Sequence, residues 1–298
     1  MPRIVSLVPA GTEIVAALGA EHLLVGISHE CDFPPTIRHL PRVTTTPVDS
    51  SRPSGDIDGV VRGLRDAGRP VIAVNPERLR TLQPDLILTQ DLCDVCAVVE
   101  GDLRALAEVL KPGPKLLSLR ARTLEGIFRD IQEVGAALER SDDADELMAG
   151  LRARLGRLRS SRPPRPPRVV CLEWLEPLFF AGHWVPELVE IAGGSDVGAT
   201  AGSESVRRNW SELRALAPDL LLVALCGFGV ERALAEWERL LHGPGEEMDA
   251  AARSAPVWVL DGNAYTSRPG PRVADGAARI QAAMLGRELP GLLRLGRR

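Results

Sequence analysis

The sequence has few aromatic residues and no long hydrophobic run. Phe, Trp and Tyr together make up 4% of the 298 residues, and Tyr occurs once. No stretch approaches the roughly 18 consecutive apolar residues that a membrane-spanning helix needs, so we expect no insertion into a membrane. Because aromatic side chains are so rare, each one that falls at the end of a predicted strand is a candidate ligand contact.

An amino-terminal export signal is also missing. The apolar run 4–8 is shorter than the apolar core of a signal peptide, which has about 7–15 residues, and it meets Pro9. For the sequence as written we expect a cytoplasmic protein, and a periplasmic or surface protein if a leader has been removed.

The charge pattern and the absent motifs exclude several classes of partner. The formal net charge is -4 and the basic residues are scattered, so we expect no nucleic-acid partner. Residues 9–12 precede a predicted helix but lack the Walker lysine and the spaced glycines of a dinucleotide site, so NAD and ATP are not expected. The G-x-S-x-G and H-E-x-x-H signatures of common hydrolases are absent too.

Five cysteines are an odd set, which favours reduced thiols over a disulfide framework. Cys93 and Cys96 have the spacing of half a zinc site. With His29 and Cys31 they would make a set of soft ligands for zinc, for another transition metal or for the metal of a tetrapyrrole. Two alternatives stay open, namely small buried side chains and a redox pair.

Segments typical of strands and helices alternate along the chain, and the pattern occurs twice. Residues 168–172 (RVVCL) repeat 3–7 (RIVSL), and residues 218–223 (PDLLLV) repeat 84–89 (PDLILT). The length favours about two domains. The sequence therefore predicts an α/β fold of two Rossmann-like lobes with parallel sheets, whose ligands lie beyond the carboxyl ends of the strands.

A long amphipathic helix is predicted between the two halves, over residues 141–160. Its buried face is expected to contain Leu147, Leu151, Leu155 and Leu158. Acidic residues at its start and arginines at its end suit the helix dipole, and its length is roughly 28 Å at about 1.5 Å per residue. We expect lobes at 1–140 and 161–298, joined by this rigid helix, with a ligand cleft between them.

The predicted strand ends carry a dense group of aromatic and polar side chains. Trp174 and Trp184 are candidates to stack on a flat macrocycle, with Glu173 or His183 meeting its amide edge or its metal. The alternative is that Trp184 belongs to the core and His183 caps a helix. The complete set of expected ligand contacts is Thr12, His29, Asp32, Phe33, Gln90, Glu173, Trp174, His183, Trp184, Phe228 and Tyr265.

Several stretches resemble one family of proteins. Residues 3–13 (RIVSLVPAGTE), 25–28 (VGIS), 31–34 (CDFP) and 82–87 (LQPDLI) are similar to substrate-binding proteins of cobalamin and siderophore ABC transporters, most closely to the cobalamin-binding branch of the helical-backbone class III proteins. The resemblance covers nearly the whole chain. It implies two lobes on one rigid helix, a corrinoid in the cleft and small hinge motion.

The resemblance also implies docking on an ABC permease. The docking acid lies seven residues before each Pro-Asp pair, which is Glu77 in the first half. Ser211 occupies that position in the second half, where the neighbouring Glu212 is the substitute. Residues 48–71 look like an insertion relative to the family pattern.

We therefore expect a binding protein for cobalamin, another corrinoid or a related tetrapyrrole or metal chelate, with binding as its only chemistry. The alternative is a cytosolic metal-dependent enzyme built on the same fold, with a site of Cys, His and Glu side chains.

Overall fold

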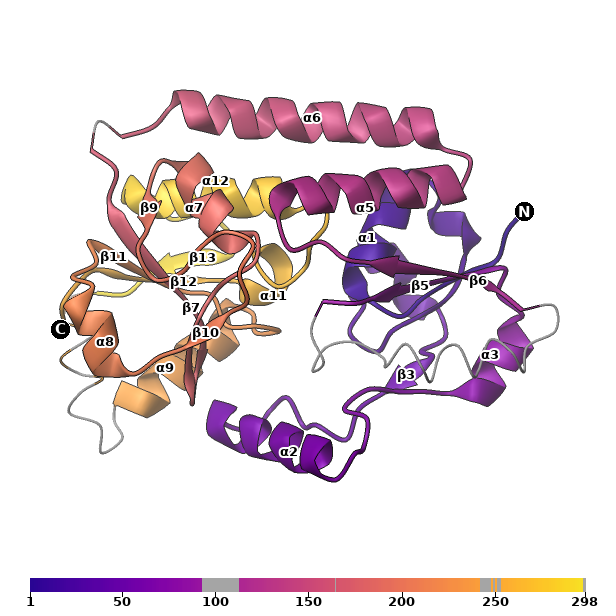
Figure 1. Ribbon diagram of the computed structural model, residues 1–298, viewed down its shortest axis with the longest axis horizontal. Helices are drawn as coiled ribbons and strands as arrows, with labels where there is room; N and C mark the ends of the chain where they lie inside the picture. Colours follow the sequence, from indigo (N-terminus) through magenta and orange to yellow (C-terminus); the bar gives the residue numbers. More distant parts are fainter. Residues whose placement is uncertain (93–112, 164, 242–247, 249, 251–252, 297–298) are drawn as a thin grey trace. The chain divides into compact units, whose positions relative to one another are not determined.

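The computed structural model in Figure 1 describes residues 1–92, 113–163, 165–241, 248, 250 and 253–296. This part of the chain has the predicted α/β fold and forms two compact units. Unit 1 comprises Met1–Arg52, Gly59–Ala121 and Glu125–Ala149, and unit 2 comprises Pro53–Asp58, Arg122–Leu124 and Gly150–Arg298. None of the described helices is both long enough and apolar enough to cross a membrane.

Unit 1 is built on a four-stranded parallel sheet. Its strands in spatial order are β2 (Leu24–Ile27), β1 (Ile4–Ser6), β5 (Leu86–Gln90) and β6 (Lys115–Leu119). The central strands β1 and β5 are buried almost throughout, which agrees with their continuous apolar sequences. The helices are α1 (Pro9–Ala17), α2 (Ser54–Asp66), α3 (Pro76–Leu82) and α5 (Leu124–Ala137), with short 3₁₀ helices at Glu21–Leu23 and Pro35–His39. The strands β3 (Thr44–Thr45) and β4 (Ala73–Val74) form a separate two-stranded antiparallel sheet.

Unit 2 contains a seven-stranded mixed sheet, so the prediction of a parallel sheet holds only for its centre. Its strands are β7 (Arg168–Leu175), β8 (Leu178–Phe180), β9 (Ser195–Asp196), β10 (Val206–Arg207), β11 (Leu220–Val223), β12 (Val257–Leu260) and β13 (Leu292–Arg294). Strands β7, β9, β11 and β12 pair in parallel, whereas β8, β10 and β13 add antiparallel pairs. The two residues between β7 and β8 are too few for a parallel crossover, so these strands must form a hairpin.

Five helices accompany this sheet in the described part of unit 2. They are α7 (Val185–Ala192), α8 (Trp210–Ala215), α9 (Val230–Leu241), α11 (Gly262–Tyr265) and α12 (Val273–Met284). Figure 1 labels each of them. Gln281 of α12 donates from Nε2 to the carbonyls of Leu158 and Ala192, at 2.9 and 3.2 Å, which ties α12 to α7.

The predicted sequence repeat corresponds to a repeated hydrogen-bond pattern. Asp85 Oδ2 accepts the amide of Arg3 at 2.7 Å, and Asp219 Oδ2 accepts the amide of Arg168 at 2.8 Å. In each unit the aspartate amide donates back to the arginine carbonyl. The Arg and the Pro-Asp of each half therefore set the register of the first strand against its parallel neighbour.

The predicted connecting helix is one continuous helix, α6 (Ser141–Ser160), with the predicted bounds. Its buried face contains Ala144, Met148, Leu151 and Leu155, with Leu147 and Leu158 partly buried beside them. Residues up to Ala149 belong to unit 1 and residues from Gly150 to unit 2. One uninterrupted helix thus connects the two units.

Candidate functional site

The predicted ligand residues of unit 1 follow the carboxyl ends of its parallel strands. Thr12 lies in α1 after β1, residues 28–34 form the loop after β2, and Gln90 ends β5. We call residues 28–34 the unit 1 loop. Since the carboxyl ends of parallel strands meet at one edge of a sheet, these segments lie where the sequence predicted them.

Thr44 holds the imidazole of His29. Thr44 Oγ1 accepts the His29 amide at 2.9 Å and lies 2.7 Å from His29 Nδ1. The same hydroxyl donates its only hydrogen to Ser28 Oγ at 3.0 Å, so Nδ1 must carry the proton and Nε2 the lone pair. Burial lowers the pKa of His29, with Arg42 adding to this effect and Glu30 opposing it. A neutral imidazole of this kind is suited to metal coordination through Nε2.

Thr12 and Cys31 face the interior of unit 1. Both are essentially unexposed, and Thr12 Oγ1 lies 3.1 Å from Cys31 Sγ. Arg42 fixes the loop through Nη1, which donates to the Ser28 carbonyl at 2.9 Å and also to the Cys31 carbonyl. The predicted contacts in this loop that retain solvent exposure are His29, Asp32 and Phe33.

The predicted metal site depends on two residues that lie outside the described part of the chain, Cys93 and Cys96. Within the described residues, no three His, Cys, Asp or Glu side chains are close enough together to hold a metal ion. The third predicted ligand, Cys31, is buried against Thr12. A site that includes Cys93 and Cys96 stays a prediction.

In unit 2, Glu173 and Trp174 lie at the carboxyl end of β7. The half-buried Trp174 ring meets the buried Phe228 ring edge-on, with ring centroids 5.3 Å apart, and its Nε1 donates to the Glu176 carbonyl at 3.0 Å. The guanidinium of Arg232 lies 4.6 Å from the centre of the Phe228 ring. Trp174 is therefore fixed by both a ring contact and a hydrogen bond.

Ser205 joins Glu173 to the segment that carries His183. Its Oγ donates to Glu173 Oε2 at 2.7 Å and accepts the Gly182 amide at 3.2 Å. His183 has a left-handed backbone (φ 54°), held by the bond from its own amide to the Ser203 carbonyl at 2.6 Å. The structure thereby brings together Glu173, Trp174, His183 and Phe228, which we call the unit 2 site.

His183 and Trp184 have buried ring nitrogens for which the described residues supply no hydrogen-bond partner, His183 Nε2 and Trp184 Nε1. Burial lowers the pKa of His183, with Arg122 adding to the effect and Glu204 opposing it. The imidazole is therefore neutral near pH 7. Trp184 is 3% exposed and begins α7 as its N-cap, which agrees with the core alternative for this residue.

Tyr265 ends the single-turn helix α11. Asp261 caps this helix by accepting the Ala264 amide at 2.8 Å. The half-buried Tyr265 ring lies under the guanidinium of Arg279, 3.9 Å from the ring centre. Its place as a ligand contact stays a prediction.

The two predicted docking acids have different surroundings. Glu77 is exposed in the first turn of α3, whose N-cap is Asn75. Glu212 closes a capping box on α8, because its Oε2 accepts the Asn209 amide at 2.8 Å while Asn209 Oδ1 accepts the Glu212 amide. The Glu212 carboxylate is therefore already engaged in starting its own helix.

Sequence reasoning did not find the residues that position these side chains. Three of them, Thr44, Arg42 and Ser205, lie between 11 and 32 residues along the chain from the groups that they hold. The fourth, Arg232, packs on the Phe228 ring. Hydroxyl and guanidinium side chains so far along the chain from their partners follow no periodic sequence pattern that would predict the contact.

Comparison with known proteins identifies the family. The sequence pattern of the periplasmic binding protein family matches residues 4–239. The chain belongs to this family. The vitamin B12-binding protein of Vibrio cholerae is 22% identical over 281 residues, which cover 93% of this chain and 87% of that relative.

Solved structures have the same fold at low sequence identity. A periplasmic heme-binding protein from Pseudomonas aeruginosa is 22% identical with a TM-score of 0.72, and the likeness covers 99% of both chains. The periplasmic vitamin B12-binding protein of V. cholerae is 21% identical with a TM-score of 0.60, over 96% of this chain and 98% of that one. At such identities these neighbours establish the fold and not the ligand.

Proposed function

We propose that this protein is the substrate-binding component of an ABC transporter and that it binds cobalamin or a related tetrapyrrole. Relatives support this ligand class, since they include a vitamin B12-binding and a heme-binding protein. The observation that carries the proposal is the unit 2 site. It combines a fixed, half-exposed indole, a carboxylate and a neutral imidazole at the carboxyl edge of the sheet. Such a group suits a large flat ring with polar edges.

Each residue of the unit 2 site has a role in this proposal. The Trp174 ring stacks on the macrocycle, and Phe228 prevents it from turning away. Glu173, whose Oε2 is held by Ser205, accepts hydrogen bonds from peripheral amides of the ligand. Protein contacts already hold Trp174 and Glu173, so little side-chain freedom is lost on binding.

The metal of the ligand has two candidate protein ligands, His29 and His183. Both imidazoles are neutral near pH 7 because burial lowers the pKa of each. His29 Nε2 carries the lone pair that cobalt or iron needs. His183 Nε2 is buried, so the His183 side chain would have to move before it could coordinate the metal. The metal here arrives with the ligand and is part of the cargo.

Titration of the ligand-free protein with hydroxocobalamin, cyanocobalamin and hemin tests the proposal by absorbance and calorimetry. We expect a 1:1 complex with at least one of them, and Trp174→Ala should weaken it by about tenfold or more. Trp210→Ala is the matched control, because Trp210 packs on Trp237 and not on Phe228. Absence of binding for all three compounds at about 50 μM would refute the ligand class.

The axial ligand is tested through the absorption spectrum of bound hydroxocobalamin. A coordinating imidazole replaces the metal-bound water and shifts the spectrum, and His29→Ala or His183→Ala should abolish the shift. His22→Ala is the control, since His22 is exposed in the 3₁₀ helix before β2. Binding that shows no shift in the wild-type protein would exclude coordination by either residue.

Transporter docking and location form a second part of the proposal. The family description points to the periplasm, the second of the two locations considered from the sequence. We propose that the exposed Glu77 contacts a permease, whereas Glu212 is held by its capping box. Glu77→Gln should then weaken binding to the permease more than Glu212→Gln, as measured with the permease in nanodiscs. Equal effects would contradict this assignment.

A further inference from the structure

Residues 46–72, between β3 and β4, form a closed excursion of the chain that we call the latch segment. Its two ends are joined by the antiparallel pairs Thr44–Val74 and Thr45–Ala73. Thr46 Oγ1 adds a hydrogen bond to the Val71 carbonyl at 2.8 Å. The segment therefore leaves and re-enters unit 1 at one place, and α2 is its main element.

The amino end of α2 is buried in unit 2. Pro53–Asp58 belong to unit 2, although the rest of the segment belongs to unit 1. The Ser54 amide donates to Glu236 Oε1 at 2.7 Å, and these residues are 0% and 1% exposed. A carboxylate at a helix start satisfies a free amide and complements the helix dipole.

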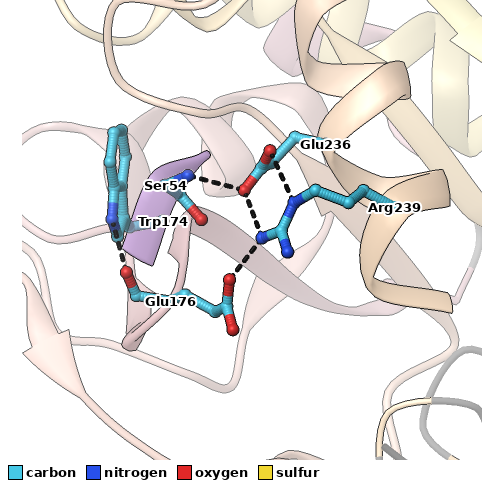
Figure 2. A network of polar contacts seen from close by, with 5 residues as sticks. All are labelled: Ser54, Trp174, Glu176, Glu236 and Arg239. Carbon is cyan, nitrogen blue, oxygen red and sulfur yellow. Dashed lines mark hydrogen bonds and ion pairs between the residues drawn. The ribbon is translucent and has the colours of Figure 1, made fainter. Parts of the chain in front are cut away.

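Figure 2 shows how this contact continues toward Trp174. Glu236 accepts from Arg239 Nε and Nη2, at 3.2 and 2.8 Å, and Arg239 also pairs with Glu176. Glu176 lies in the turn between β7 and β8, and its carbonyl accepts Trp174 Nε1 at 3.0 Å. A continuous set of polar contacts thus runs from the start of α2 to the indole of the unit 2 site.

The backbone of α2 also packs on this turn. A Cβ atom at Gly55 would lie 3.4 Å from the Cβ of Glu176 and 3.3 Å from its Oε2. A side chain at Gly55 would thus be in contact with Glu176, without a severe overlap. The start of α2 therefore covers Glu176 directly as well as through Glu236 and Arg239.

We propose that the start of the latch segment, residues 53–58 of unit 2, holds Glu236, Arg239 and Glu176 in place, and that these three act as positioning residues for Trp174. When α2 is docked, the β7–β8 turn is held from outside and the Glu176 carbonyl keeps the Trp174 indole in one orientation. When α2 is released, Glu236 loses one of its donors and the turn loses its cover. The part that concerns ligand affinity rests on the proposed function, whereas docking and Trp174 orientation do not.

An engineered disulfide tests docking without any ligand. The distance between the Cβ positions of Gly55 and Glu176 is close to the roughly 3.5–4.5 Å of natural disulfides. The double variant Gly55→Cys with Glu176→Cys should cross-link nearly completely under mild oxidation, as measured by mass spectrometry of the linked peptides. The two single variants control for reaction with the native cysteines. Failure of the folded double variant to cross-link would overturn docking.

Two single substitutions test the positioning role, Glu236→Gln and Ser54→Pro. The first weakens the charge-assisted bonds, and the second removes the amide hydrogen at a first helical position, where proline is accepted. The matched control is Glu238→Gln, an exposed position on the same helix. We expect amide exchange in residues 55–58 to rise by about tenfold or more in both variants and to stay unchanged in the control.

The indole N–H resonance of Trp174, assigned with Trp174→Phe, reports the orientation of that side chain in the ligand-free protein. It should shift in Glu236→Gln and Ser54→Pro and not in Glu238→Gln. An unchanged exchange rate or an unshifted Trp174 resonance in every variant that folds would overturn the proposal. If one variant is too unstable to study, the other decides. If the wild-type protein bound no tetrapyrrole, the proposed function would fail and these ligand-free results would still decide the latch.

Discussion

Asp196 provides the sharpest prediction about stability. It ends β9, and its Oδ1 accepts the amides of Gly198 and Ala199 at 2.9 and 3.0 Å. Its Oδ2 is buried, with no hydrogen-bond partner among the described residues. Burial raises the pKa of Asp196 from 3.8 to about 6, although the two amides oppose this. The folded protein therefore carries a poorly solvated charge at neutral pH.

The sign and size of the effect follow from linkage. The raised pKa means that the folded state binds the Asp196 proton more tightly than the unfolded state does. This contribution to stability is complete below pH 3.8 and is lost as the pH rises through about 6. Raising a pKa from 3.8 to about 6 corresponds to roughly 3 kcal/mol, since each pH unit is worth about 1.4 kcal/mol.

Asp196→Asn mimics the protonated side chain and removes this dependence. Relative to wild type, its free energy of unfolding should therefore increase by roughly 2 kcal/mol between pH 4 and pH 7. All five tryptophans lie beyond residue 173 in unit 2, so denaturant unfolding followed by Trp fluorescence reports on the unit that contains Asp196. The exposed Asp66→Asn is the control. Parallel pH profiles for wild type and Asp196→Asn would refute the reasoning.

Three further substitutions have defined outcomes. Gly262→Ala should destabilise unit 2 by about 2 kcal/mol or more, because its Cβ would lie 2.7 Å from the Ala224 carbonyl carbon; a variant as stable as wild type in Trp-monitored unfolding would contradict this. Gly150→Ala should raise the free energy of unfolding, measured by thermal denaturation and circular dichroism, by about 0.5–1 kcal/mol, because a Cβ atom at this position inside α6 meets open space. A lower free energy of unfolding would contradict this. Asp219→Ala removes the acceptor of the Arg168 amide and should cost about 1–2 kcal/mol, which unchanged denaturation midpoints would exclude.

The parts of the fold that the sequence predicted are those set by local patterns. The leucine spacing and the flanking acids and arginines fixed the bounds of α6, and the repeated Arg and Pro-Asp segments located equivalent strands in both halves. The antiparallel edge of unit 2 was not predicted. Residues 173–184 look like a ligand loop because they are aromatic and polar, yet most of them form the hairpin β7–β8. The aromatic and polar composition of these residues suggested a ligand site, but it did not predict the hairpin.

The candidate site was predicted only in part, for a related reason. Residue types at strand ends identified His29, Glu173, Trp174 and His183, because a parallel sheet brings such ends to one edge. The orientation of these side chains depends on partners that only the folded chain supplies. Thr12 illustrates the limit, because its position after a strand suggested a ligand donor while the fold turns its hydroxyl toward Cys31.

Three of the candidate side chains share one mode of support. His29 is held by a threonine hydroxyl, Glu173 by a serine hydroxyl and Trp174 by a main-chain carbonyl, and each partner lies in the same unit as the residue that it holds. These partners are neutral, so the hydrogen-bond support of each candidate does not depend on the ionisation of the partner. One step further away, the ion pairs of Glu236 and Glu176 with Arg239 hold the turn whose carbonyl fixes Trp174. High salt should therefore affect the candidate ligand groups through the latch segment first, and only afterwards through their direct hydrogen bonds.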